Sequence, residues 1–181
     1  MWQKIRPDKV IFDGKWRKVL EKTYKMPDGT EKSFEILNAQ FDHRAVGIVA
    51  VTEDGMAVVA EQYRPGPDEL LQEIPAGMVD EGEDLKVAAL RELKEETGYE
   101  GDPAKTIYLG PYWRDPYYDL ASHYFFVPDV KLVTKQKLDE GEFVDVKLVH
   151  PAELLEIARA GKTTEAVGVL LARDYLEKYK E

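Results

Sequence analysis

Three glutamates stand close together near the end of a segment with helical periodicity. Glu92, Glu95 and Glu96 are spaced so that, on a helix, they fall within an arc of roughly 100°. Like charges at this spacing cost about 0.2 to 0.5 kcal/mol per pair, and their place near the helix C-terminus also opposes the helix dipole. A hard divalent cation such as Mg²⁺, which takes oxygen ligands, would offset both repulsions. The alternative is a solvated acidic face.

The segment that carries these glutamates is expected to form a helix over residues 83–97. Leu85, Ala89 and Leu93 recur every four residues and would form its buried side. Gly98 follows the last acidic turn, where a left-handed residue commonly ends a helix. The helix would therefore pack along one side and collect charge along the neighbouring side.

The composition excludes several classes of partner and site. The chain has 181 residues, a formal net charge of -10, three histidines and no cysteine. The negative charge argues against a nucleic-acid partner, whereas a small phosphorylated ligand held by a cation and a few arginines fits. The histidines lack metal-ligand spacing, so zinc is not expected. The absence of cysteine excludes disulfides and thiolate sites and favours a cytoplasmic location.

The remaining elements indicate one α/β domain with an N-terminal extension. Residues 1–40 are expected to form a small antiparallel β arm with a turn at 27–29, followed by a domain over residues 41–181. Strands and helices interleave without regular alternation, which favours a mixed sheet with helices on its faces. The expected strands cover 45–52, 56–63, 70–77, 106–110, 123–130 and 143–149, and two closing helices cover 151–161 and 163–180.

No membrane or export segment is expected. The longest apolar run, residues 45–51, is too short to span a bilayer, and the first ten residues lack the apolar core of a secretion signal.

The acidic segment also carries a known motif. The chain matches the fixed positions of the Nudix box at Gly77, Glu83, Arg91, Glu92, Leu93, Glu95, Glu96 and Gly98. It therefore resembles the Nudix hydrolases, with Tyr99 in place of the usual aliphatic residue at the end of the box. The resemblance implies an α/β/α sandwich that hydrolyses a nucleoside diphosphate linked to another moiety, with Mg²⁺ as cofactor and Mn²⁺ as the alternative ion.

The resemblance also implies roles for individual residues. Glu92, Glu96 and the backbone carbonyl of Ala76 match metal ligands of the family. Glu95 would support these ligands, and Arg91 would orient the glutamates by salt bridges. A glycine at position 77 would allow the tight turn that brings this loop against the metals.

Two further stretches resemble the ADP-ribose pyrophosphatase branch of the family. EQYR at 61–64 and LLQEIPAGMVDEGE at 70–83 imply that Arg64 contacts the ligand and that Glu73 helps to bind its ribose or adenine side. The alternatives are an exposed charge at a strand end for Arg64 and a structural hydrogen-bond acceptor for Glu73. Members of this branch commonly form homodimers through arms like residues 1–40, so a homodimer is expected.

A general base is expected from a loop after the box. LDEGEFVDV at 138–146 resembles the mobile loop that often supplies it, with Glu142 as the first choice and Glu140 as the second. The alternative is a solvated acidic hairpin.

One segment departs from the ADP-ribose branch, which usually has Ser-Pro-Gly about sixteen places after the box. This chain has GPYWRDPYYDL at 110–120, where Pro111 and Pro116 both miss that position. Tyr117 or Tyr118 could match a tyrosine of dinucleoside polyphosphate hydrolases, or the aromatics could stack on a base or bury at a dimer contact.

The leading hypothesis is hydrolysis of ADP-ribose to AMP and ribose 5-phosphate, or of related nucleoside diphosphate sugars. The alternatives are a dinucleoside polyphosphate hydrolase and a non-catalytic nucleotide-binding regulator.

Overall fold

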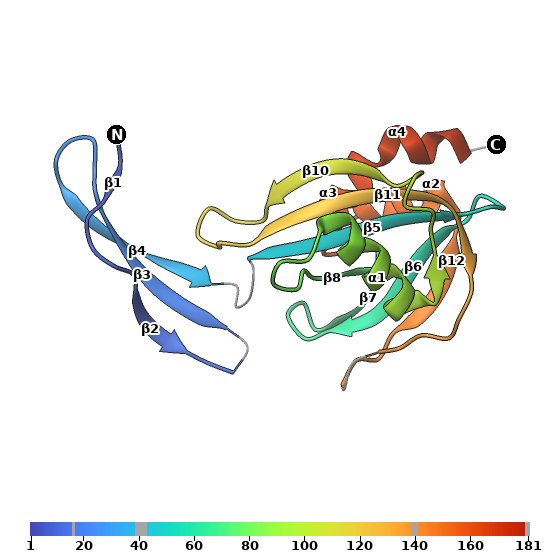
Figure 1. Ribbon diagram of the computed structural model, residues 1–181, viewed down its shortest axis with the longest axis horizontal. Helices are drawn as coiled ribbons and strands as arrows, with labels where there is room; N and C mark the ends of the chain where they lie inside the picture. The colour runs from blue at the N-terminus through green and yellow to red at the C-terminus, as the bar shows by residue number, and fades with distance from the viewer. Residues whose placement is uncertain (16, 39–42, 139–140, 180–181) are drawn as a thin grey trace.

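The N-terminal arm forms its own small sheet in the computed structural model, which describes residues 1–15, 17–38, 43–138 and 141–179. The antiparallel strands pair in the order β1-β3-β2, and β4 pairs with the other edge of β3. Figure 1 shows this sheet projecting from one end of the main body. The strands are β1 (Gln3–Lys4), β2 (Lys9–Asp13), β3 (Lys18–Lys25) and β4 (Glu31–Asn38).

The main sheet is mixed, as the sequence predicts. Its central order is β10-β11-β5-β6-β12, in which β11 runs parallel to β5 and the other neighbours are antiparallel. The short strands β7, β8 and β9 pair with β6, β5 and β11. The strands are β5 (Arg44–Thr52), β6 (Ala57–Arg64), β7 (Glu69–Glu73), β8 (Ala76–Met78), β9 (Tyr99–Glu100), β10 (Ile107–Trp113), β11 (Ala121–Leu132) and β12 (Asp145–Val149).

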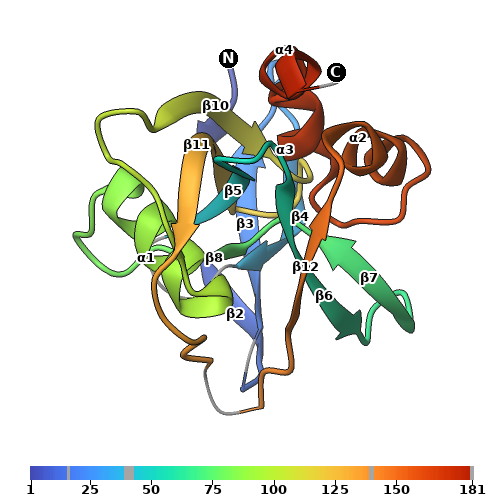
Figure 2. The ribbon, with the colours of Figure 1, turned by 90° about the vertical axis from the view of Figure 1, so that its right-hand side faces the viewer.

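Helices cover both faces of this sheet (Figure 2). Along β5, Val46 and Ile48 point into a core shared with α1, whereas Val49 and Val51 point into a second core under the C-terminal helices. This alternation is what a strand buried on both faces requires. The α/β/α sandwich is therefore confirmed. The helices are α1 (Leu85–Thr97), α2 (Pro151–Arg159), α3 (Ala166–Leu171), α4 (Arg173–Leu176) and the 3₁₀ turn η1 (Glu177–Tyr179).

The acidic helix α1 ends where the sequence predicts and starts two residues later. The side chain of Asp84 accepts hydrogen bonds from the backbone N–H groups of Lys86 and Val87, which makes Asp84 the N-cap. Gly98 has φ 76° and closes the helix in the left-handed conformation.

Two expected elements are divided in the structure. The predicted strand 70–77 becomes β7 and β8, which pair with different strands, because Pro75 lies between them and its carbonyl accepts from the Ile48 N–H at 2.8 Å. The predicted helix 163–180 becomes α3, α4 and η1. Thr164 and Glu165 are engaged in tertiary contacts instead, and Ala172, at ψ 1°, separates α3 from α4.

The arm meets the body at the segment between β10 and β11. The Leu37 N–H donates to the Tyr117 carbonyl at 2.8 Å, and the Leu37 carbonyl accepts from the Asp119 N–H at 3.1 Å. The Tyr117 ring stacks on Phe34 of β4, with ring centroids 6.1 Å apart. Among the described residues, no helix has the length and apolar character needed to cross a bilayer.

Candidate active site

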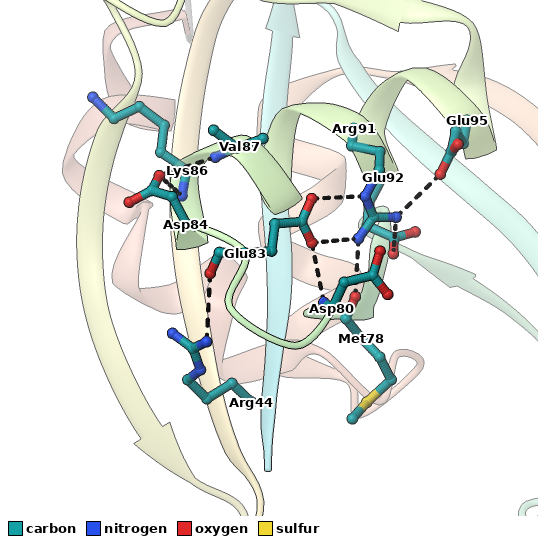
Figure 3. A network of polar contacts seen from close by, with 10 residues as sticks. All are labelled: Arg44, Met78, Asp80, Glu83, Asp84, Lys86, Val87, Arg91, Glu92 and Glu95. Carbon is teal, nitrogen blue, oxygen red and sulfur yellow. Dashed lines mark hydrogen bonds and ion pairs between the residues drawn. The ribbon is translucent and has the colours of Figure 1, made fainter. Parts of the chain in front are cut away.

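Arg91 organises the acidic side of α1 (Figure 3). Its Nε and Nη2 donate to the two oxygens of Glu83 at 2.9 Å each, and Nη2 also donates to the Met78 carbonyl at 3.1 Å. Its Nη1 donates to Glu92 at 2.8 Å and to Glu95 at 3.1 Å. The carboxylates raise the pKa of Arg91, chiefly through the Glu83 hydrogen bonds. The guanidinium thus fixes the box loop to the helix and orients two of its glutamates.

Gly77 leaves room for the Glu92 carboxylate. A Cβ placed on residue 77 would lie 2.1 Å from the Glu92 Cδ. Its φ lies outside the left-handed region, unlike that of Gly82 or Gly98. The glycine is therefore needed here for space, which corrects the expected reason that it permits a tight turn.

Glu96 is a buried carboxylate beside the loop that precedes α1. Its side chain is part of a residue only 7% exposed, and its Oε2 accepts from the Ala76 N–H at 3.0 Å. Burial, together with the charges of Glu92 and Glu142, raises the pKa of Glu96 to about 8. Burial also raises the pKa of Glu92, although Arg91 opposes this increase. Two neighbouring carboxylates are thus disfavoured as bare anions.

The chemistry of these donors fits a hard divalent cation. Glu92, Glu96 and the loop at Ala76 would offer oxygen ligands, and a bound cation would favour the charged form of both carboxyls, whose pKa values are raised by burial and by neighbouring charges. Within the described residues, no three His, Cys, Asp or Glu side chains gather closely enough to hold a metal ion by themselves. An ion here would therefore take further oxygens from backbone, water and substrate.

Of the two candidate general bases, the described residues include Glu142 but not Glu140. Glu142 lies close enough for its charge to raise the pKa of both Glu92 and Glu96. It also lines a cavity of about 730 Å³ together with Arg64. Glu140 lies outside the described residues. Catalysis by either residue stays a prediction.

Arg64 and Glu73 form an ion pair in which Glu73 is buried and Arg64 is partly exposed. Glu73 is 0% exposed and accepts from Arg64 Nε at 2.5 Å. Its other oxygen accepts from the N–H and the hydroxyl of Thr164. Arg64 lines the cavity that contains Glu142 and also a second cavity, so it is accessible to a ligand. Ligand contacts of Arg64 and Glu73 stay predictions, and the burial of Glu73 favours the structural alternative that the sequence left open.

The second cavity, of about 450 Å³, contains residues that the sequence reasoning missed. It borders the box loop at Ala76 and Gly77 and is also lined by Arg114, Thr164 and Glu165. Arg114 lies in the segment that departs from Ser-Pro-Gly, which was the only sequence signal for it. Its partner Glu165 is 51 positions away, so no local pattern connects them.

Comparison with known proteins agrees with the fold and the motif. The chain belongs to the Nudix family, because the NUDIX domain family model matches residues 41–170. It is thus an enzyme of the Nudix pyrophosphohydrolase class, a class that generally uses divalent metal ions.

Two relatives and one solved structure are similar to this chain over most of its length. The chain is 30% identical to an ADP-ribose pyrophosphatase of Bacillus subtilis over 177 residues, which cover 94% of this chain and 93% of the relative. It is 32% identical over 169 residues to a methanol dehydrogenase activator of Bacillus methanolicus, covering 92% and 88%. The crystal structure of an ADP compounds hydrolase matches with a TM-score of 0.80 at 20% identity, covering 96% and 94% of the two chains, and supports the fold.

Proposed function

We propose that this Nudix hydrolase splits the diphosphate bond of ADP-ribose, giving AMP and ribose 5-phosphate, with Mg²⁺ as its ion and Mn²⁺ as the alternative. Related nucleoside diphosphate sugars are further substrates. The observation that carries the proposal is the placement of Glu92 and Glu96 where burial and the nearby charge of Glu142 raise the pKa of both carboxyls, while the charge of Arg64 opposes the increase at Glu96. The similarity to an ADP-ribose pyrophosphatase over nearly the whole chain supports this substrate.

Each residue of the site has a distinct task in this reaction. Glu92, Glu96 and the Ala76 carbonyl would hold the metal, and Arg91 keeps Glu92 and Glu95 oriented. A bound divalent ion supplies charge neutralisation at the diphosphate and lowers the pKa of water. The Glu142 carboxylate accepts the proton of the attacking water. Arg64 binds the ligand while its Nε is fixed by Glu73.

A panel of diphosphate substrates tests the proposal. The protein with Mg²⁺ should hydrolyse ADP-ribose faster than diadenosine triphosphate, and chromatography should identify AMP and ribose 5-phosphate. Chelation should abolish turnover, and Glu96→Gln should remove most of it. Equal rates for ADP-ribose and the dinucleoside compound would contradict the substrate assignment. Full turnover by Glu96→Gln would contradict the metal site.

We also propose that residues 1–40 are a dimerisation arm appended to the hydrolase domain 41–181. The arm sheet has little core of its own, since all five residues of β2 are exposed, including Val10 at 50% and Phe12 at 57%. A second copy that covers this surface would bury it. The absence of cysteine supports a cytoplasmic location.

A further inference from the structure

We propose that Arg114 is a specificity-determining residue that binds the sugar beyond the diphosphate, and that Glu165 is its positioning residue. This inference rests on the proposed function, because it assigns the part of the substrate that extends past the box loop. The site is the cavity of about 450 Å³ whose lining includes Ala76 and Gly77 of the box loop together with Arg114 and Tyr118.

The cavity and the acidic site share the box loop as a common border. Gly77 touches Glu92, and the Ala76 N–H binds Glu96, so a diphosphate held at these glutamates lies at the edge of the cavity. Arg64 lines the cavity together with Arg114, and its charge acts on Glu96, so the cavity and the acidic site share this arginine. A group bonded to the diphosphate would extend from the box loop into this cavity, which Arg114 lines.

The Arg114 guanidinium is held by two hydrogen bonds and has further N–H groups that a ligand can use. Its Nε donates to Ser122 at 2.8 Å and its Nη2 donates to Glu165. Within the part of the chain that the structure describes, Nη1 has no hydrogen-bond partner, and the side chain remains 31% exposed. These N–H groups are available to a ligand in a fixed direction.

Glu165 is held in turn by Tyr124, whose ring packs against Gly47 and Gly168. Its second oxygen accepts from the Tyr124 hydroxyl at 2.7 Å, and Glu165 itself is 3% exposed. A Cβ on Gly47 would lie 2.7 Å from the Tyr124 ring, and one on Gly168 would lie 2.3 Å from it. Such close approach from β5 and α3 leaves the ring one position, which orients Glu165 and hence Arg114.

The charges of the cavity favour a neutral, oxygen-rich group. Arg114 and Arg64 each pair with a buried glutamate, so they offer directional donors with little net positive charge. Arg17 of the arm also lines this cavity. Hydroxyl and ring oxygens of a pentose or hexose satisfy such donors, and the apolar lining at Val46, Met78 and Leu120 suits the carbon faces of the sugar. An additional phosphate would require more uncompensated charge.

Steady-state kinetics of Arg114→Ala with Mg²⁺ test this assignment on ADP-ribose, ADP-glucose and diadenosine triphosphate. Loss of a charged hydrogen bond should raise KM for both sugar substrates about 10- to 100-fold and leave kcat within about twofold. The KM for diadenosine triphosphate should change by less than about threefold. Glu165→Gln and Tyr124→Phe should raise the sugar-substrate KM by smaller factors, because they loosen Arg114 without removing it.

Two further variants distinguish binding from folding. Arg173→Ala breaks a solvent-exposed arginine–glutamate pair between α4 and η1, away from the cavity, and should leave all three KM values unchanged. Arg114→Lys keeps the charge without the planar fork and should retain a raised KM for the sugars. Full rescue by lysine, or an equal KM increase for all three substrates, would overturn the assignment. If the wild-type protein hydrolyses neither sugar compound, the proposed function fails instead.

Discussion

The Glu92 carboxylate occupies the space in which a side chain at position 77 would begin. A Cβ on Gly77 would lie 2.3 Å from each Glu92 oxygen, a distance that real Cβ atoms do not show. Since Arg91 also holds this carboxylate at 2.8 Å, Glu92 is confined between the box loop and its own helix. The position of one metal-ligand candidate therefore depends on a residue without a side chain.

Gly77→Ala should inactivate the enzyme more than it destabilises it. The added methyl group would push Glu92 off its position, and misplacement of a catalytic group by about 1 Å costs about 10²-fold in rate. Activity measured at saturating Mg²⁺ and ADP-ribose, alongside thermal melting, separates the two effects. Wild-type kcat in this variant would show that the carboxylate can move without consequence.

Arg91→Lys should lower both stability and activity. A lysine ammonium is a point charge and cannot bind Glu83 with two parallel bonds while also reaching Glu92 and Glu95. Loss of these charged hydrogen bonds should cost about 1.5 to 3 kcal/mol of unfolding free energy. Chemical denaturation of the two proteins measures this difference in unfolding free energy. Lys94→Ala, which breaks an exposed pair between α1 and Glu100 of β9, is the control and should change stability by less than about 0.5 kcal/mol.

The acidic helix was predictable because its signals are local. The four-residue repeat of Leu85, Ala89 and Leu93 defines the buried side, and Gly98 lies within the same fifteen residues. The Nudix box is equally local, so the sequence alone brought Arg91 and its glutamates together.

The far side of the site was not predictable in this way. Thr164 and Glu165 directly precede α3, yet instead of extending that helix they bind Glu73 of β7 and Arg114, which follows β10. Tertiary contacts of this kind override local propensity, and no spacing rule reports them. The cavity lined by Arg114 became visible only when these distant segments were placed side by side.

Glu142→Gln should slow hydrolysis by about 10² to 10⁴ while leaving KM nearly unchanged, as loss of a general base does. Single-turnover rates with ADP-ribose give the chemical step directly. Glu140→Gln is the matched comparison, since it removes a carboxylate two positions away. A large loss in Glu140→Gln with none in Glu142→Gln would transfer the role to Glu140.

Charge placed on the exposed strand β2 should separate the expected homodimer. Val10→Asp with Phe12→Asp would introduce four carboxylates per dimer into the surface proposed to be covered. Light scattering should then give the mass of a single chain, against twice that mass for the wild type. Lys9→Asp, at an already charged position of the same strand, should leave the mass unchanged. A wild-type protein that is monomeric at all concentrations would contradict the arm proposal.

The free energy of unfolding of the metal-free protein should fall as pH rises, because burial of Glu96 is less costly in its protonated, neutral form. Its folded pKa of about 8 exceeds the ordinary value of 4.5, so between these values the folded chain binds a proton that the unfolded chain has lost. The stabilising contribution is complete below about pH 4.5 and is lost as pH rises through about 8. The raised pKa of Glu92 acts in the same direction. Mg²⁺ competes with this proton, so its stabilising effect should grow over the same range.

Denaturation midpoints measured in chelator at about pH 5.5, 7 and 8.5 would give the slope of stability against pH. Glu96→Gln carries no titrating proton and should flatten it, and it should also weaken stabilisation by Mg²⁺ at the highest pH. Glu153→Gln on α2 removes an exposed carboxylate of the same type and should retain the wild-type slope. Parallel slopes for the wild type and Glu96→Gln would mean that Glu96 is ionised in the folded protein without a metal. The repulsion among the box glutamates would then be relieved by Arg91 and solvent rather than by a proton or a cation.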